Sequence, residues 1–485
     1  MGTDKPSLNK FAQVEQYIVE AISQGVFQSD DKLPSIRQLG RDLNVSKNTV
    51  IRAYQELEAA DIIYAVPKSG YRVLPPQPLS NEHHSPHSVD LLSLSKQILS
   101  YPQSKERLPT GSAHPNIDAP AIKSLYAEIG RQSRAQSHMP SHYQLPPGNA
   151  LLIKQLAKMS RELGVKTHSQ AIAVTQGAQQ AISLALRALT RPGDIVAVES
   201  PCYFGNLLLM ESLGLKVVEV ASCVRRGMDP QALKHAIEEW PIRVILITPN
   251  FANPTGARIP LERRIELLSV SRDIPIIEDD VFGALAFDDG LLPLKTLDNQ
   301  DRVIYVNSLS KMLDSRLRIG WLLSGKYHSV IEKYLLCENM GSSNLIQSAV
   351  SEFLATGKYR QHISKMKRMY QHNIRRFCLL LTQALDQYAE LRCQHHLSQP
   401  QGSFLVWLTL PQHLDSFALY QACRRRRISI FPGTVFSTSG QFRQCIRLSC
   451  AHFEETTEWH TGIELLAELI HQQLKKRLES PCKTG

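Results

Sequence analysis

The sequence predicts a multidomain protein, in which a small helical domain with a short hairpin precedes a large α/β domain. That domain is expected to have a mainly parallel sheet and a smaller C-terminal α+β lobe. Three observations predict this. The chain has 485 residues, too many for one compact core. Its first 75 residues combine helical periodicity with turn signals. From about residue 89, long helical segments alternate with short apolar runs, a pattern typical of a sheet buried on both faces.

Composition excludes several classes of protein. No apolar run approaches the roughly 18 residues of a membrane span, and the N-terminus lacks the apolar stretch of a secretory signal. Nine scattered cysteines without a CxxC pair predict the reduced thiols of a cytoplasmic protein. The seventeen histidines show no ligand spacing with cysteines or carboxylates, so we predict no metal site.

The first domain is predicted to contain three helices. Apolar residues at helical spacing predict a helix over residues 11–23, with Gly25 at its end. Ser35 and Ser46 are N-cap residues for two further helices, the second running to about Ala59. A short polar turn joins these two helices, and the strand-like runs IIYAVP and GYRVL follow them. This order predicts a winged helix-turn-helix.

The segment from Leu33 to Val73 resembles the GntR family of winged-helix regulators along nearly its whole length. The resemblance rests on LPS followed by Arg37, on VSKNTV, on Arg-Ala-Tyr at residues 52–54 and on Gly70. In that family the third helix enters the major groove of double-stranded DNA. The resemblance implies these DNA-binding residues: Arg37, Ser46, Lys47, Asn48, Thr49, Arg52 and Gly70.

The charges of this segment agree with DNA binding. Between Lys32 and Tyr54 there are five basic residues and one acidic residue, so one stripe could neutralise phosphates. The alternative is a stable three-helix unit with a solvated basic face. The sequence favours the DNA-binding interpretation.

A segment rich in Pro, Ser and His, LPPQPLSNEHHSPHS at residues 74–88, predicts a fairly extended linker. We therefore predict a DNA-binding domain over residues 1–75, a linker over 76–88 and the large domain over 89–485. The C-terminal lobe is expected to begin near residue 342.

Several polar residues of the large domain follow predicted strands. In AIAVTQGAQ a strand ends at Thr175 and a helix begins near Ala178, so the free N–H groups of that helix could bind a phosphate. Asn253, Asp279 and Lys311 each follow another apolar run. Each residue alone also fits an ordinary structural role. Together they are expected at the edge where open α/β sheets bind ligands.

This set resembles the fold-type I pyridoxal-phosphate enzymes, the aspartate aminotransferase superfamily, over about residues 105–475. The resemblance implies pyridoxal 5'-phosphate as the cofactor. Lys311 matches the lysine that attaches covalently to the cofactor, and Asp279 matches the carboxylate that faces the pyridine nitrogen. Asn253 matches the partner of the ring hydroxyl and Tyr203 the stacking aromatic, although Tyr203 alone also fits a core position. The implied phosphate-binding residues are Gly177, Ala178, Gln179, Ser308, Ser310 and Arg318.

Two further residues match positions outside this cofactor set. Tyr143 matches a tyrosine that reaches the phosphate of the neighbouring subunit. Arg447 matches the arginine that binds a substrate α-carboxylate, a task that suits a bidentate guanidinium.

The two halves together resemble the MocR subfamily of bacterial regulators. The resemblance implies a homodimer that binds operator DNA and whose large domain senses pyridoxal phosphate, an amino compound or both. An active aminotransferase that carries a winged helix is one alternative. Another is a DNA-binding protein whose large domain has lost the cofactor and serves only for dimerisation.

Three departures from the superfamily bear on catalysis. Phe282 stands where a tyrosine is common, Ser315 and Arg316 replace a usual Pro-Gly, and Ile153 replaces a customary arginine. They predict at most a partial transamination without sustained turnover, and so favour sensing.

Two basic segments lie outside the first domain: the four arginines at 424–427 and a helix around residues 358–376. Either could contact DNA beyond the winged helix. The sequence favours solvated helix faces, which also account for part of the net charge of +10.

Overall fold

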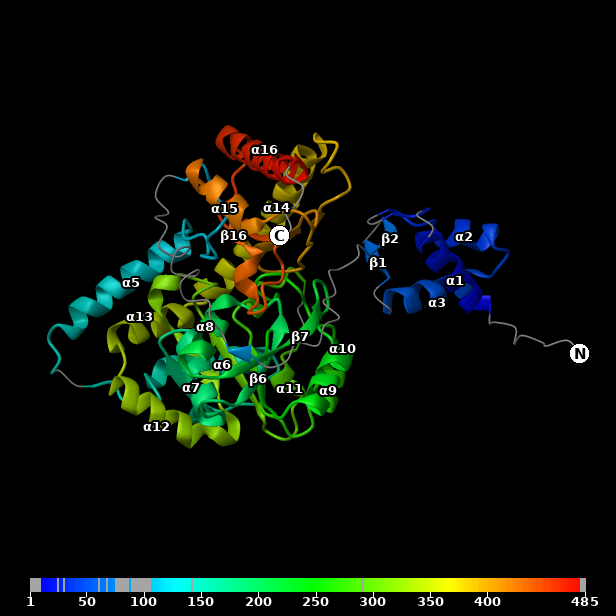
Figure 1. Ribbon diagram of the computed structural model, residues 1–485. Helices are drawn as coiled ribbons and strands as arrows, with labels where there is room; N and C mark the ends of the chain where they lie inside the picture. Colours follow the sequence, from blue (N-terminus) through cyan, green and yellow to red (C-terminus); the bar gives the residue numbers. More distant parts are fainter. Residues whose placement is uncertain are drawn as a thin grey trace, which may run out of the picture. The chain divides into compact units, whose positions relative to one another are not determined.

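The computed structural model describes residues 10–23, 26–28, 31–59, 62–66, 69–74, 87–88, 106–140, 143–288 and 292–479 (Figure 1). The chain forms two compact units, residues 1–79 and 80–485, each described here by itself. Gly25 and most of the predicted linker, residues 76–86, lie outside the described residues. The last two residues of that linker form strand β3 (His87–Ser88), which pairs with the large sheet of the second unit.

The first unit is the predicted winged helix-turn-helix. Its helices are α1 (Lys10–Ser23), α2 (Ile36–Asp42) and α3 (Lys47–Ala59). The antiparallel strands β1 (Ile63–Val66) and β2 (Gly70–Val73) form the wing.

Local hydrogen bonds fix where these helices begin. The Ser35 hydroxyl accepts from the Gln38 N–H (3.2 Å) and the Ser46 hydroxyl from the Thr49 N–H (3.1 Å), so both serines cap a helix as predicted. The core between the helices and the wing is apolar and includes Val14, Ile18, Leu39, Val50, Ala53, Tyr54, Leu57, Ile63 and Val73.

The second unit is built on a nine-stranded sheet with the order β3-β7-β6-β9-β10-β11-β12-β5, in which β8 also pairs with β7. Within this order, strands β7, β6, β9, β10 and β11 are parallel to one another. Strand β12 is antiparallel to β11, and β5 is antiparallel to β12. The strand bounds are β5 (Ile172–Thr175), β6 (Ile195–Ser200), β7 (Lys216–Cys223), β8 (Gly227–Met228), β9 (Ile242–Ile247), β10 (Ile276–Asp279), β11 (Val303–Ser308) and β12 (Gly320–Leu323).

Helices cover both faces of this sheet, as the continuous apolar runs predict. Alternate residues of β6 show it: Val196 and Val198 pack in a cluster with α7, α8 and α12, whereas Ala197 packs with α9 and α10. A third cluster joins α5, α6 and α13. The helix bounds are α5 (Pro120–Gln136), α6 (Ala150–Glu162), α7 (Ala178–Leu189), α8 (Phe204–Ser212), α9 (Pro230–Glu239), α10 (Leu261–Val270), α11 (Leu294–Leu297), α12 (His328–Asn339) and α13 (Asn344–Ala355).

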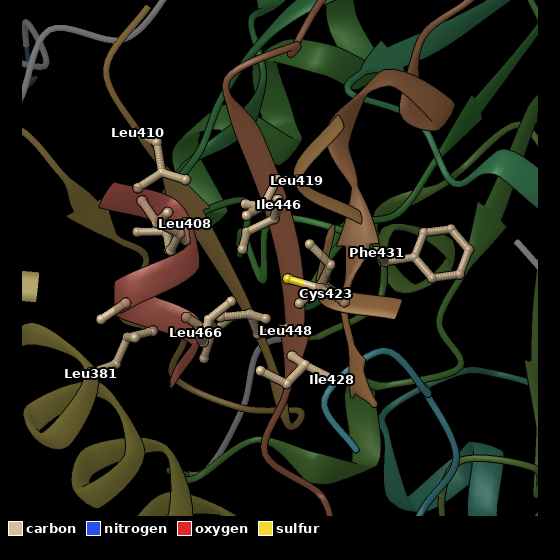
Figure 2. Packing of buried hydrophobic residues seen from close by; sticks show 14 of the residues in the cluster. Leu381, Leu408, Leu410, Leu419, Cys423, Ile428, Phe431, Ile446, Leu448 and Leu466 are labelled. Atoms are coloured by element: carbon tan, nitrogen blue, oxygen red, sulfur yellow. The ribbon is translucent and has the colours of Figure 1, made fainter. Parts of the chain in front are cut away.

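A smaller α+β lobe follows along the chain. Its four-stranded antiparallel sheet has the order β13-β14-β17-β16. Figure 2 shows side chains from its strands and helices meeting in one apolar core. The lobe consists of α14 (Lys358–Asp386), β13 (His396–Leu397), β14 (Leu405–Thr409), α15 (Ser416–Arg425), β15 (Ile428–Ser429), β16 (Phe431–Pro432), β17 (Cys445–Ser449) and α16 (Thr457–Glu479).

Two segments cross the boundary between the large sheet and this lobe. Helix α13 follows residue 342, where we expected the lobe to begin, but it packs against α5 and α6. Strand β4 (Leu108–Pro109), early in the chain, pairs in parallel with β15 of the lobe. The segment after the linker is therefore tied to the C-terminal lobe.

Membrane-spanning helices and metal sites were sought among the described residues. None of their helices is long and apolar enough to cross a membrane. Nor does the described part of the chain bring three His, Cys, Asp or Glu side chains together where they could hold a metal ion.

Candidate cofactor pocket and nucleic-acid interface

A pocket of about 280 Å³ lies at the carboxyl ends of the parallel strands. Ten predicted residues from separate parts of the chain line it. They are Ala178, Gln179, Tyr203, Asn253, Asp279, Ser308, Ser310, Lys311, Arg318 and Arg447.

One end of the pocket is the N-terminus of α7, where Gly177 is the capping residue with a φ of 87°. A Cβ atom on Gly177 would lie 2.5 Å from the Arg318 guanidinium, so the glycine allows that cation to approach the helix end. Arg318 donates to the Gln176 carbonyl (3.0 Å), which holds it there. Gly320 allows a different close approach, because its Cβ would lie 2.7 Å from the Ala178 nitrogen; the glycine lets β12 lie against the start of the helix. The free N–H groups and the guanidinium together favour an anion such as a phosphate.

Lys311 follows β11 and extends into the pocket, where its amine donates to the Ala113 carbonyl (2.8 Å). Burial is the main reason that the pKa of Lys311 is lowered to about 8. The nearby Arg447 cation also lowers this pKa, and the Asp279 carboxylate partly opposes the two effects. The amine is thus much more often neutral, and nucleophilic, near neutral pH than an ordinary lysine.

Asp279 ends β10 and is buried. Among the described residues its carboxylate accepts one hydrogen bond, from the Val281 N–H (3.3 Å). Burial raises the pKa of Asp279 to about 7, against the opposing effect of Lys311. A buried carboxylate with so few partners is stabilised by a cation or an N–H donor placed in the pocket.

Arg447 lies on β17 and is buried, with its guanidinium 4.4 Å from the centre of the Phe431 ring. It donates to the Asn253 side-chain oxygen (3.3 Å) and to the Gly111 carbonyl, whereas its buried Nε has no partner among the described residues. Burial lowers the pKa of Arg447 to about 10, which still leaves it charged at neutral pH. It is a cation suited to binding a carboxylate.

Neighbouring residues hold the shape of the pocket. The Gln179 amide donates to the Gly205 carbonyl (2.7 Å) and so ties the start of α7 to α8. The Ser308 hydroxyl accepts from the Ser310 N–H (3.1 Å), which fixes the turn before Lys311. Tyr203 lies half-buried at the start of α8.

The three departures noted in the sequence have structural counterparts. Phe282 is buried against Phe404, and its ring centre lies 5.8 Å from the Lys311 amine. Arg316 forms an ion pair with Asp314 (2.6 Å). Ile153 is buried in the apolar cluster of α5 and α6.

Tyr143 does not line the pocket. It is 75% exposed and lies next to Gly341. Within a single subunit it therefore contributes nothing to the cofactor site.

Sequence reasoning missed the segment of residues 111–114, which contributes four lining residues. The His114 ring and the Ser315 hydroxyl form a hydrogen bond there (2.8 Å). Burial, followed by the Lys311 charge, lowers the pKa of His114. The sequence signal was weak, a Gly and a His-Pro within GSAHP at residues 111–115, and Phe431, also missed, carried none.

In the first unit the predicted DNA-contacting residues lie in α2, at the start and middle of α3 and at the wing. Six of them are exposed: Arg37, Ser46, Lys47, Asn48, Arg52 and Gly70. Thr49 is half-buried and hydrogen-bonds the Ser46 hydroxyl (2.8 Å), so both hydroxyls already serve the helix cap. Arg52 lies over the Phe11 ring (4.1 Å). The side chains of Arg37, Lys47 and Asn48 are exposed and have no hydrogen bond or ion pair among the described residues.

Comparisons with known families match both units. Residues 10–73 match the bacterial regulatory proteins of the gntR family, and residues 112–458 match aminotransferase class I and II. In fold, residues of the large unit are similar to LysN, the α-aminoadipate aminotransferase of Thermus thermophilus. The TM-score is 0.67 at 23% identity, over 79% of this chain and 95% of that one.

Two curated relatives match nearly the whole chain. The uncharacterized HTH-type transcriptional regulator YjiR of Escherichia coli is 33% identical, over 96% of this chain and all of the relative. YdcR, another uncharacterized HTH-type transcriptional regulator of Escherichia coli, is 32% identical over the same shares. The winged helix, the aminotransferase fold and these full-length matches show that the chain belongs to the MocR-type family of GntR transcriptional regulators, which carry an aminotransferase class I and II domain.

Proposed function

We propose that the large domain binds pyridoxal 5'-phosphate and an amino acid, and that this binding changes the affinity of the winged-helix domain for operator DNA. One observation carries the proposal: an amine, a carboxyl and a guanidinium with shifted pKa values meet in one pocket, at Lys311, Asp279 and Arg447.

The residues present fit this cofactor. The α7 terminus with Arg318 offers N–H donors and positive charge to a phosphate. Asp279, with few partners of its own, suits a protonated ring nitrogen. Asn253 offers an amide near a ring oxygen, and Tyr203 offers a flat face for stacking.

Each of the three groups has a distinct task. Bound pyridoxal phosphate would supply an aldehyde that condenses with amines and a ring that withdraws electrons. Lys311 offers a largely desolvated amine to that aldehyde. Arg447 offers its unpaired Nε and neighbouring N–H groups to a ligand carboxylate, which would compete with the Gly111 carbonyl. The effector is therefore expected to be an α-amino acid rather than a simple amine.

Phe282 argues for sensing over turnover. A tyrosine there could donate a hydrogen bond to the cofactor, whereas the Phe282 ring only fills space beside the Lys311 amine. Proton control at the reacting centre is then weaker. We expect binding or a half-reaction, without sustained transamination.

We also propose that the protein acts in the cytoplasm as a homodimer. Tyr143, Leu145 and Met340 are large side chains, each more than half exposed, and the Gln144–Ser342 bridge holds their segments together. Such an apolar patch favours association. A dimer would present two winged helices to two half-sites. Sedimentation should give twice the chain mass, and Leu145→Asp should lower the dimer fraction.

The test of sensing is DNA affinity measured with and without ligand. An effector acts only through unequal affinity for two states of the protein. We therefore expect pyridoxal phosphate with an amino-acid mixture to change the DNA dissociation constant of the wild type but not of Lys311→Ala. Multiple turnovers with an amino donor and a 2-oxo acid, with no effect on DNA, would instead identify an aminotransferase.

A further inference from the structure

We propose that the exposed face of helix α14 in the large unit is a second DNA-binding surface, which contacts phosphates without reading sequence. The inference rests on DNA binding by the N-terminal domain. It does not depend on the cofactor.

The composition of α14 is strongly one-sided. The helix carries seven lysine and arginine residues and no acidic residue before Asp386, its last position. Opposite charges three or four positions apart stabilise a helix, and α14 has no acidic residue before Asp386 to form such pairs. The excess of basic residues in α14 therefore does not stabilise the helix.

Some of these basic residues lie on one face of α14, which we call the α14 stripe. Its members recur every three or four positions and are all exposed: Lys365, Arg368, His372 and Arg375. At 3.6 residues per turn they fall within about a quarter of the helix circumference. Apolar residues such as Ile363, Met366 and Phe377 are buried on the other side. The α14 stripe therefore faces solvent in the single subunit.

The nearby acids pair with cations outside the stripe, although Glu455 also interacts electrostatically with His372. Glu162 pairs with Arg360, and Glu455 pairs with Arg376. Glu128 pairs with Arg131 (2.6 Å) on the neighbouring α5. In the described part of the chain, none of the three stripe cations Lys365, Arg368 and Arg375 has an ion pair.

DNA is the partner that this geometry fits. From Lys365 to Arg375 the stripe spans about 15 Å, a length over which one DNA strand presents four or five phosphates, spaced about 3.4 Å apart along the axis. The winged helix also holds DNA on the same chain, which raises the local DNA concentration at the large unit. A weak, sequence-independent surface then adds to the affinity.

The four arginines at residues 424–427 are a different case. Arg424 and Arg427 both have interaction partners. For residues 424–427 we therefore retain the interpretation that the sequence favoured, a solvated helix end. For α14 the exposed and unpaired cations now favour DNA binding over a solvated face.

The test compares the salt dependence of DNA binding in the full-length chain. The probe is duplex DNA from the region upstream of the protein's own gene. The variant is Lys365→Gln, Arg368→Gln and Arg375→Gln together, because glutamine keeps a similar helix propensity. The matched control removes three exposed cations elsewhere, with Arg191→Gln, Lys216→Gln and Lys234→Gln. Thermal unfolding verifies that both variants are folded.

Loss of three phosphate contacts should reduce the slope of log K against log salt by about 2.7 for each subunit whose stripe contacts the DNA. Over a fourfold rise in salt, the variant should lose about 40-fold less affinity than the wild type for each subunit in contact. The control should keep the wild-type slope. An unchanged slope in the stripe variant, or an equal reduction in the control, would overturn this inference alone. Failure of the wild type to bind the DNA at all would overturn the DNA-binding function as well.

Discussion

The lowered pKa of Lys311 makes a quantitative prediction about its reactivity. With a pKa of about 8, roughly one fifth of the amines are neutral at about pH 7.4, against about one in a thousand for an ordinary lysine. Attachment of pyridoxal phosphate should therefore be about 200-fold faster at Lys311 than at a surface lysine of equal nucleophilicity. The pH midpoint of that rate should lie near 8.

The assay follows the visible absorbance after pyridoxal phosphate is mixed with the cofactor-free protein, across a pH series. Borohydride reduction and peptide mapping then locate the modified lysine. Lys311→Ala should abolish the fast phase, whereas Lys326→Ala, which changes an exposed lysine, should not. A midpoint near 10.5, or a label spread over surface lysines, would refute the reasoning about this pocket.

Three further predictions concern other residues. Burial raises the pKa of Glu199, on β6, to about 8 in the folded protein. Between about pH 4.5 and about pH 8 the folded chain therefore keeps a proton that the unfolded chain loses, and the free energy of unfolding should fall as pH rises. Glu199→Gln should remove up to about 4 kcal/mol of that fall, as measured by denaturant unfolding at the two ends of this range; an equal fall in the variant would contradict this. Arg447→Lys should weaken amino-acid binding about 10- to 150-fold while pyridoxal phosphate still attaches, so equal affinities would exclude the carboxylate contact. Lys47→Gln should lower the salt slope of DNA binding by about 0.9 for each subunit bound, and an unchanged slope would remove Lys47 from the interface.

Much of the site could be predicted because its residues follow strands. Parallel strands bring their carboxyl ends to one edge, so Asn253, Asp279 and Lys311 had to lie close together once the strands were recognised. The helices of the winged helix could also be predicted, because Ser35 and Ser46 are local capping signals that the structure confirms.

The remainder depends on contacts that leave little trace in residue type. The Gly111 and Ala113 carbonyls hold Arg447 and Lys311, yet any residue supplies a carbonyl. The packing of α13 against α5 and α6 likewise depends on tertiary contacts between distant segments. No local pattern encodes such a pairing.

The most direct test of the regulatory account is a footprint of the purified protein on DNA upstream of its own gene, at fixed physiological salt. The reactions are run with and without pyridoxal phosphate and a mixture of amino acids, because salt alone can shift affinity by orders of magnitude. The account predicts protection of two spaced half-sites whose extent changes with these ligands in the wild type, but not in Lys311→Ala. Protection that is identical in every condition would contradict a sensing role for the large domain.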